Sequence, residues 1–417
     1  MNRWLIVWLA ILLVCVGTPV RSASAAEGDV VWTNTFILGD KSAEVNTVAA
    51  HSSGVYSVGE GGGRAFMKSH TAGGKIRWSL SFTTAANTLL EDVAVDDTGV
   101  YVVGWVIERN GTCADYDAFV RRFTHQGTLR WSRQISGSTD DCWRDPTSDE
   151  ATGVAIDSSG VYVTGYIYGA ISGHKNAGLS DIFVRKYSKD GSVVWTRQHG
   201  TKNRDFASQI TLDPWGVLVS RSTLGAWQGK TNLGGFDAFV RKYSRNGELY
   251  WTRQFGTSES DGGGGIVADG ANFYVGGGTS GRLPGQTSKG ESDGWLRKYR
   301  GDGTLRWTRQ FGTSASAGAG DLTSDGDRIY LIGGTYGSFG GYTNKGEYDV
   351  FITNFSSAGD RGWTRQFGTT GNDYGSGIAL GPRPTDSQQN DDRGLYVGGG
   401  FKEGVKRHKA FVYKFEE

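Results

Sequence analysis

A seven-residue motif, Trp-Thr-Arg-Gln-Phe-Gly-Thr, recurs along this chain and constrains its fold more than any other feature. It is intact at Trp251–Thr257, Trp307–Thr313 and Trp363–Thr369, and one residue differs at Trp195–Thr201. More divergent copies begin at Trp32, Trp78 and Trp131. The intervals between successive tryptophans of this set are 46, 53, 64, 56, 56 and 56 residues. Self-similarity at such a period indicates an architecture built from repeated units.

Each unit contains four short apolar or aromatic runs bounded by turn residues, which predict four strands. Four antiparallel strands repeated around an axis form a β-propeller. We place the Trp strand outermost, because the connection that follows it is longer than the hairpins within a unit. The runs that we place innermost are Val93–Asp96, Val154–Asp157, Ile210–Asp213 and Ile266–Asp269. No stretch after residue 26 has a helical apolar period, so an all-β chain with almost no helix is expected.

The two ends of the repeat array predict how the ring closes. The array opens with an isolated Trp strand, Val30–Phe36, and stops at Lys409–Phe415, a third strand with no Trp strand after it. Pairing these two segments would remove two open sheet edges at once. We therefore predict a single domain over residues 27–417, a seven-bladed β-propeller in which the strand around Trp32 completes the last blade.

The segments that carry the repeat resemble a known family. Residues 237–257, together with Gly160–Gly165, are similar to the bacterial β-propeller repeat abbreviated SBBP. The resemblance covers nearly all of residues 27–417 and implies a seven-bladed propeller in a secreted or surface protein. The segments Gly63–Phe66 and His408–Phe411 depart from it, because they lack the Asp that precedes the third strand in the other units. The resemblance implies no reaction, since one fold hosts many functions.

The first residues predict the compartment, and the charge balance limits the partners. Arg3, the apolar run Trp4–Val16 and the small residues up to Ala26 follow the order of a secretory signal peptide, here residues 1–26. An uncleaved anchor is the alternative. We expect a secreted chain, extracellular or periplasmic, with no membrane span once this segment is removed. The 44 Lys and Arg against 43 Asp and Glu leave no net field for nucleic acid or an anionic membrane.

Two acidic positions recur from unit to unit, and both are expected on the face that carries the longer loops. They are candidate binding residues, and calcium is the one cofactor considered, because hard cations favour oxygen ligands on loops. The structural alternative is that each carboxylate accepts hydrogen bonds from loop N–H groups or pairs with a neighbouring Arg. The residues are Asp117, Asp181, Asp237, Asp293 and Asp349 before the third strand, and Asp205, Asp261 and Asp373 before the first.

Basic residues also recur, on the third and outermost strands. Because alternate residues of a strand share a face, each Arg lies beside aromatic side chains, and stacking on those rings is the predicted arrangement. An anion-binding belt is the alternative. The residues are Arg121, Arg185, Arg241 and Arg297 on the third strand, and Arg133, Arg197, Arg253, Arg309 and Arg365 on the outermost.

Two irregular loops on the longer-loop face each contain a cysteine, Cys113 and Cys142. The loops are neighbours in a propeller, so a disulfide between these cysteines would form without distortion in an oxidising compartment. Two free thiols are the alternative. No nucleophile, base or metal-ligand set is identifiable from spacing.

Loops on a rigid scaffold are where binding usually resides. The leading hypothesis is therefore a monomeric, non-catalytic scaffold that recognises a protein or glycan through its loop-rich face. The alternatives are an extracellular hydrolase or lyase with its site at the mouth of the central channel, and a purely structural surface or matrix component.

Overall fold

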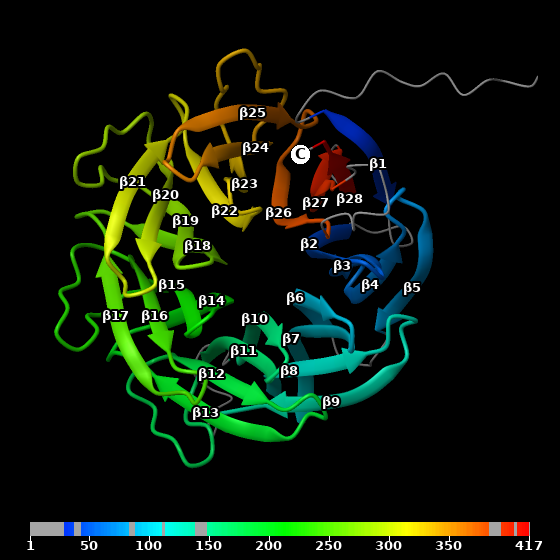
Figure 1. Ribbon diagram of the computed structural model, residues 1–417, viewed down its shortest axis with the longest axis vertical. Coiled ribbons are helices and arrows are strands. Elements are labelled where there is room, and N and C mark those ends of the chain that lie inside the picture. Colours follow the sequence, from blue (N-terminus) through cyan, green and yellow to red (C-terminus); the bar gives the residue numbers. More distant parts are fainter. Residues whose placement is uncertain are drawn as a thin grey trace, which may run out of the picture.

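Seven four-stranded antiparallel sheets stand around a central axis in the computed structural model, which makes the chain a seven-bladed β-propeller (Figure 1). The structure describes residues 29–36, 43–82, 88–110, 113–137, 148–382, 393–403 and 407–416. Within these residues every regular element is a strand, as predicted. No helix in the described ranges has the length and apolar character needed to cross a bilayer. The predicted signal peptide lies outside the described residues.

The strands are numbered along the chain, and each blade is given from its innermost to its outermost strand. Blades 1 to 4 are β2 (Ala43–His51), β3 (Gly54–Gly61), β4 (Arg64–His70) and β5 (Ile76–Phe82); β6 (Thr88–Asp96), β7 (Gly99–Asn110), β8 (Cys113–Phe123) and β9 (Leu129–Ile135); β10 (Glu150–Asp157), β11 (Gly160–Ile167), β12 (Asp181–Tyr187) and β13 (Val193–His199); β14 (Asp205–Asp213), β15 (Gly216–Thr223), β16 (Asp237–Tyr243) and β17 (Leu249–Phe255). Blades 5 to 7 are β18 (Asp261–Asp269), β19 (Asn272–Thr279), β20 (Asp293–Arg300) and β21 (Leu305–Phe311); β22 (Ala317–Ser324), β23 (Arg328–Thr335), β24 (Asp349–Ser356) and β25 (Arg361–Phe367); β26 (Asp373–Leu380), β27 (Leu395–Glu403), β28 (Arg407–Phe415) and β1 (Val30–Phe36).

The ring is closed by its two ends, as the repeat array predicts. Strand β1 pairs antiparallel with β28, with Trp32 opposite Lys414 and Phe36 opposite Ala410. The amide of Glu416 donates a 2.8 Å hydrogen bond to the carbonyl of Asp29, so the two ends meet where the other blades have a tight turn. This pairing removes the free edges of β1 and β28, which would otherwise be open to other chains.

The faces of the ring differ in their connections. We call the face with the second-to-third-strand loops and the blade-to-blade connections the loop face, and the opposite face the turn face.

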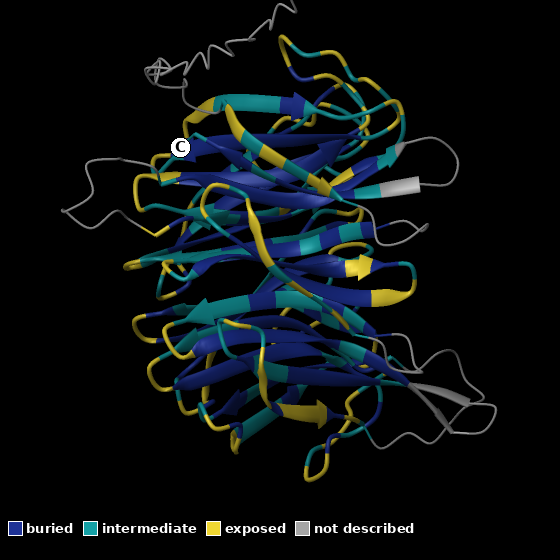
Figure 2. Ribbon diagram, turned by 90° about the vertical axis from the view of Figure 1, so that its right-hand side faces the viewer, coloured by how far each residue is buried: buried dark blue, intermediate teal, exposed yellow. Residues whose placement is uncertain are grey.

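Buried side chains of adjacent blades pack together between the sheets: Tyr101 and Val103 of blade 2, for example, share a cluster with Val163 of blade 3. Figure 2 shows the strands largely buried and the exposed residues concentrated in the connections.

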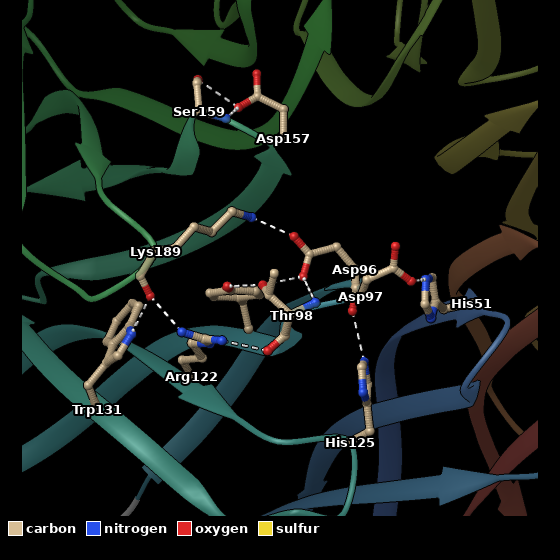
Figure 3. Close-up of polar contacts among 11 residues, drawn as sticks. His51, Asp96, Asp97, Thr98, Arg122, His125, Trp131, Asp157, Ser159 and Lys189 are labelled. Atoms are coloured by element: carbon tan, nitrogen blue, oxygen red, sulfur yellow. Dashed lines mark hydrogen bonds and ion pairs between the residues drawn. The ribbon is translucent and has the colours of Figure 1, made fainter.

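The Trp and Arg of the repeated motif join each blade to the next at the turn face. The Trp195 indole donates a 3.0 Å hydrogen bond to Arg245 O, and Arg197 Nε donates a 2.8 Å hydrogen bond to Gly247 O, both in the third-to-fourth-strand turn of blade 4. Gly247 has φ 83° and lies against the Trp195 ring, where a Cβ would come within 2.9 Å. Figure 3 shows the same contact one blade earlier, from Trp131 to Lys189 O. The motif therefore maintains the ring.

The innermost strands are longer than predicted. Strands β10, β14 and β18 begin at Glu150, Asp205 and Asp261, four or five residues before the apolar runs. The polar and glycine residues at their starts continue the pairing through a β-bulge, as between Ala207 and Gln209. A bulge interrupts the alternation of apolar and polar residues, so the pattern of the apolar run alone underestimates the strand.

Candidate ligand pocket at the channel mouth

The acidic positions predicted as binding residues lie where expected, at the loop face, and are engaged by the loops. In blades 3 to 6 the third-strand Asp accepts a hydrogen bond of 2.7–3.1 Å from a loop amide four residues earlier and one of 2.8–3.0 Å from the Gln of the repeated motif. These residues are Asp181, Asp237, Asp293 and Asp349. Asp117, in blade 2, is also buried. This arrangement matches the structural alternative.

The acidic residues that open the innermost strands hold the blade-to-blade connection. Asp205 accepts hydrogen bonds from the amide and hydroxyl of Thr201 at 2.5 and 3.0 Å. Asp261 and Asp373 accept the same pair from Thr257 and Thr369. No group of three or more His, Cys, Asp or Glu that could hold a metal ion occurs within the described ranges. Calcium binding by these residues stays a prediction.

The remaining sequence predictions concern the cysteines and the arginines. Cys113 begins β8, opposite Asn110, and Cys142 lies outside the described residues, so their disulfide stays a prediction. The predicted stacking is confirmed on the outermost strands, where each Arg lies 5.2–6.0 Å from the centroid of its motif Trp. On the third strand Arg121 lies 4.2 Å from the Phe119 ring centroid.

A cavity of about 600 Å³ lies on the propeller axis. Every innermost strand has its β-bulge at the same level, and the bulge turns one residue of each blade toward this channel. The ring so formed is Asn46, Glu91, Thr152, Ser208, Gly264, Gly320 and Ser376. The channel is therefore polar, and the acidic residues that line it are Glu91, Glu150 and Asp321.

One residue beside the channel breaks the repeat. In each innermost strand, the residue just before the bulge pairs with a residue of the second strand. In six blades this second-strand residue is a glycine: Gly59, Gly104, Gly165, Gly277, Gly333 and Gly399. A Cβ there would clash with the innermost strand, as at Gly165, where it would lie 1.9 Å from Glu150 O. Blade 4 has Arg221 at this position, opposite Ala207. A residue that departs from the repeat in this way, at a cost to packing, is typical of a functional site.

Arg221 also lines a second cavity of about 550 Å³, which opens toward the loop face and shares Tyr166 with the channel. Its walls are aromatic: Tyr166 and Phe206 pack edge to face at 4.9 Å on one side, and Tyr336 and Tyr348 lie 4.7 Å apart on the other. Its floor is Gly262, Gly278 and Gly318. A Cβ at Gly318 would meet no atom within 4 Å. The space above the floor is therefore empty because glycine has no side chain to fill it.

Two glutamates share the channel with Arg221. Burial, together with the charge of Glu150, raises the pKa of Glu91 to about 7, although the Trp105 indole donates a 3.3 Å hydrogen bond to Glu91. Burial also raises the pKa of Glu150, which accepts a hydrogen bond from the Tyr166 hydroxyl. The positive charge of Arg221 opposes both shifts. The site therefore combines the cation Arg221 with Glu91, a carboxyl group that changes protonation near neutral pH, and with Glu150, whose pKa is also raised.

Two further buried acids near the axis have structural roles. The two carboxylate oxygens of Asp92 accept 2.8 Å hydrogen bonds from the amides of Val93 and Val154, which links the innermost strands of blades 2 and 3. Asp321 does the same for blades 6 and 7. Burial raises the pKa of Asp92 to about 7 and that of Asp321 to about 6. The glutamates, rather than these aspartates, are the acids available to a ligand.

Sequence reasoning missed this pocket and its residues. The signal was available for Arg221, because the run Val217–Arg221 has Arg where the corresponding run Val161–Gly165 ends in Gly. No such signal exists for Glu91 and Glu150. They occupy different positions of their strands, one at the bulge and one two residues before it, and converge only in the closed ring.

Comparison with known proteins finds similarities at low sequence identity. No protein-family model matches this chain, so the SBBP assignment is not confirmed. The regulatory protein FlaEY of Caulobacter vibrioides is 27% identical over an alignment of 380 residues, which covers 80% of this chain and 38% of FlaEY. The chain thus spans well under half of that relative.

Among solved structures, the WD40 domain of Toxoplasma gondii coronin aligns with a TM-score of 0.47 and 8% identity, covering 94% of this chain and 89% of that one. The phage phi92 endosialidase aligns with a TM-score of 0.46 and 10% identity, covering 92% and 69%. These likenesses concern the fold alone.

Proposed function

We propose that the protein is a secreted or surface propeller that binds a glycan in the aromatic pocket beside Arg221. The observation that carries this proposal is Arg221 itself, which stands where six other blades have Gly and borders both cavities. Ligand pockets combine apolar and aromatic walls with a few polar groups that fix orientation. The pocket has this composition, and its volume of about 550 Å³ accommodates a short stretch of sugar rings.

The charges favour a neutral, hydroxyl-rich ligand over an anion. Among the described residues that line either cavity, Arg221 is the one cation, whereas Glu91, Glu150 and Asp321 line the channel beside it. Carboxyl groups accept hydrogen bonds from hydroxyls, and the guanidinium donates to hydroxyl or ring oxygens. The aromatic faces of Phe206 and Tyr336 offer apolar contact to the C–H faces of a sugar. A neutral polysaccharide segment has hydroxyl groups for the carboxyl groups and for the guanidinium, and C–H faces for the aromatic rings.

The test is an array of neutral and acidic glycans, probed with wild-type protein and with Arg221→Gly. This substitution introduces the residue of the other six blades, so the fold should be retained. Removal of a charged hydrogen-bond donor should weaken binding by about tenfold or more. Gly318→Leu adds a side chain to the floor at a position where a Cβ meets no atom within 4 Å, and it should also abolish binding. Binding that survives both substitutions would place the ligand elsewhere.

A hydrolase is the second candidate, and the raised pKa of Glu91 favours it. A carboxyl group with a pKa of about 7 is protonated often enough near neutral pH to act as a general acid, with a second carboxylate beside it as base or nucleophile. Incubation with the bound glycan should then release reducing ends, and Glu91→Gln should stop that release while binding remains. Binding without any release of reducing ends would exclude the hydrolase.

A further inference from the structure

A third cavity, of about 400 Å³, lies away from the axis on the outer part of blade 4. It is enclosed by the end of β13, the loop after β15 and the strands β16 and β17, and its lining includes His199, Trp227, Lys230, Arg241, Trp251 and Arg253. Three of these side chains are cationic, and no acidic residue lines the cavity within the described part of the chain.

The buried side chain of Arg241 is the main feature of this cavity. Its side chain is buried, with 4% of its surface exposed, and its Nε and Nη1 atoms have no hydrogen-bond partner among the described residues. The guanidinium is stacked 4.1 Å from the Trp227 ring centroid. Its counterpart in blade 3 differs, because Arg185 Nε donates a 2.8 Å hydrogen bond to Thr196. Buried guanidinium nitrogens without an acceptor are costly, so an acceptor supplied by a ligand to Nε and Nη1 would stabilise Arg241.

The cavity is also where blades 3 and 4 depart from the repeat. His199 takes the place of the motif Phe found at Phe255, Phe311 and Phe367, and its ring stacks on Tyr243 at 5.9 Å. Lys230 occupies a loop position held by Gln286 in blade 5 and Tyr342 in blade 6, where each backbone amide closes the same turn. His199 places a nitrogen where those blades have a phenyl ring, and Lys230 places a positive charge where blades 5 and 6 have neutral side chains.

The charges around the cavity are positive overall. Arg253 donates to Gly303 O at 2.8 Å and so belongs to the contact between blades, but its charge remains beside the cavity. Asp181 and Asp205 lie next to Gly200, where they accept hydrogen bonds from Gln198 and Thr201. Burial and the charges of Arg241 and Arg197 lower the pKa of His199 to about 4, so the imidazole is neutral at pH 7.

From this geometry we infer a second binding site, for a tetrahedral oxyanion, in which Arg241, Lys230 and His199 hold a phosphate or sulfate group. Arg and Lys are the usual donors to such groups. The cavity is larger than the anion, and the Trp251 ring leaves apolar surface for the organic part of a phosphate or sulfate ester. The site is separate from the axial pocket and does not depend on the proposed glycan binding.

The experiment is isothermal titration calorimetry with inorganic phosphate, inorganic sulfate, glucose 6-phosphate and glucose 6-sulfate, at constant ionic strength. Wild-type protein should bind at least one of the four, and a preference among them identifies the anion and shows whether its organic part contributes. Lys230→Gln and His199→Phe introduce residues that other blades carry at these positions, so both should fold and bind about tenfold more weakly. Lys289→Gln, on the equivalent loop of blade 5, is the matched control and should bind as wild type.

The pKa of His199, measured by NMR with and without the anion, is a second readout. A purely structural role of His199 would leave this pKa unchanged when the anion is added. A bound anion should raise the pKa of His199, because it stabilises the imidazolium. The proposal is overturned if none of the four anions binds at millimolar concentration. It is also overturned if Lys230→Gln and Lys289→Gln weaken binding equally, or if the His199 titration is unchanged by a saturating anion.

Discussion

At the scale of single residues, the Gly of the repeated motif is required by the acidic residues around it. A Cβ at Gly256 would lie 2.5 Å from Asp237 Oδ1 and 2.8 Å from Asp261 Oδ2. We predict that Gly256→Ala lowers the free energy of unfolding by about 1–3 kcal/mol, the usual cost of overpacking. Gly318→Ala, at an open position, should change it by less than about 0.5 kcal/mol. Urea denaturation measures both, and equal effects would contradict this account.

At the scale of the elements, the outermost strand of each blade contacts the turn between the third and fourth strands of the following blade. Arg309 Nε donates a 2.8 Å hydrogen bond to Gly359 O, and its guanidinium lies 5.2 Å from the Trp307 ring centroid. We predict that Arg309→Ala costs about 1.5–3 kcal/mol of stability, the range for a hydrogen bond to a charged group. Arg306→Ala, an exposed residue on the same strand, is the control. A thermal melt that ranks the two variants alike would show that the contact is unimportant.

At the scale of the whole molecule, cooperativity depends on β1. Without residues 29–36, β28 becomes an open edge, and blade 7 loses the contact that its outermost strand makes with blade 1, where the Trp32 indole donates a 2.8 Å hydrogen bond to Ala72 O. We predict that a chain starting at Ala43 unfolds over a broader range and at a lower temperature than a chain starting at Glu27. A synthetic peptide of residues 29–36 should partly restore the transition. Identical calorimetric curves for the two chains would refute closure by β1.

The sequence alone determined the number of blades, the order of strands and the closure. These follow from a periodic pattern of Trp, Gly and apolar residues, and each unit obeys local rules of strand and turn formation. It also indicated the stacking of Arg on aromatic rings, since alternate residues of one strand share a face. The hydrogen bonds that engage Asp181 and Asp237 were foreseen as one of two alternatives.

Only the tertiary structure decided where the unusual residues meet. Arg221 and Glu91 belong to blades 4 and 2, and no local rule brings them together. The closed ring does so, because it turns the bulge of every innermost strand toward one axis. His199 and Arg241 likewise meet only because β13 packs against the next blade. A periodic sequence specifies the unit, whereas a site that involves several units depends on the angle at which the units close around the axis.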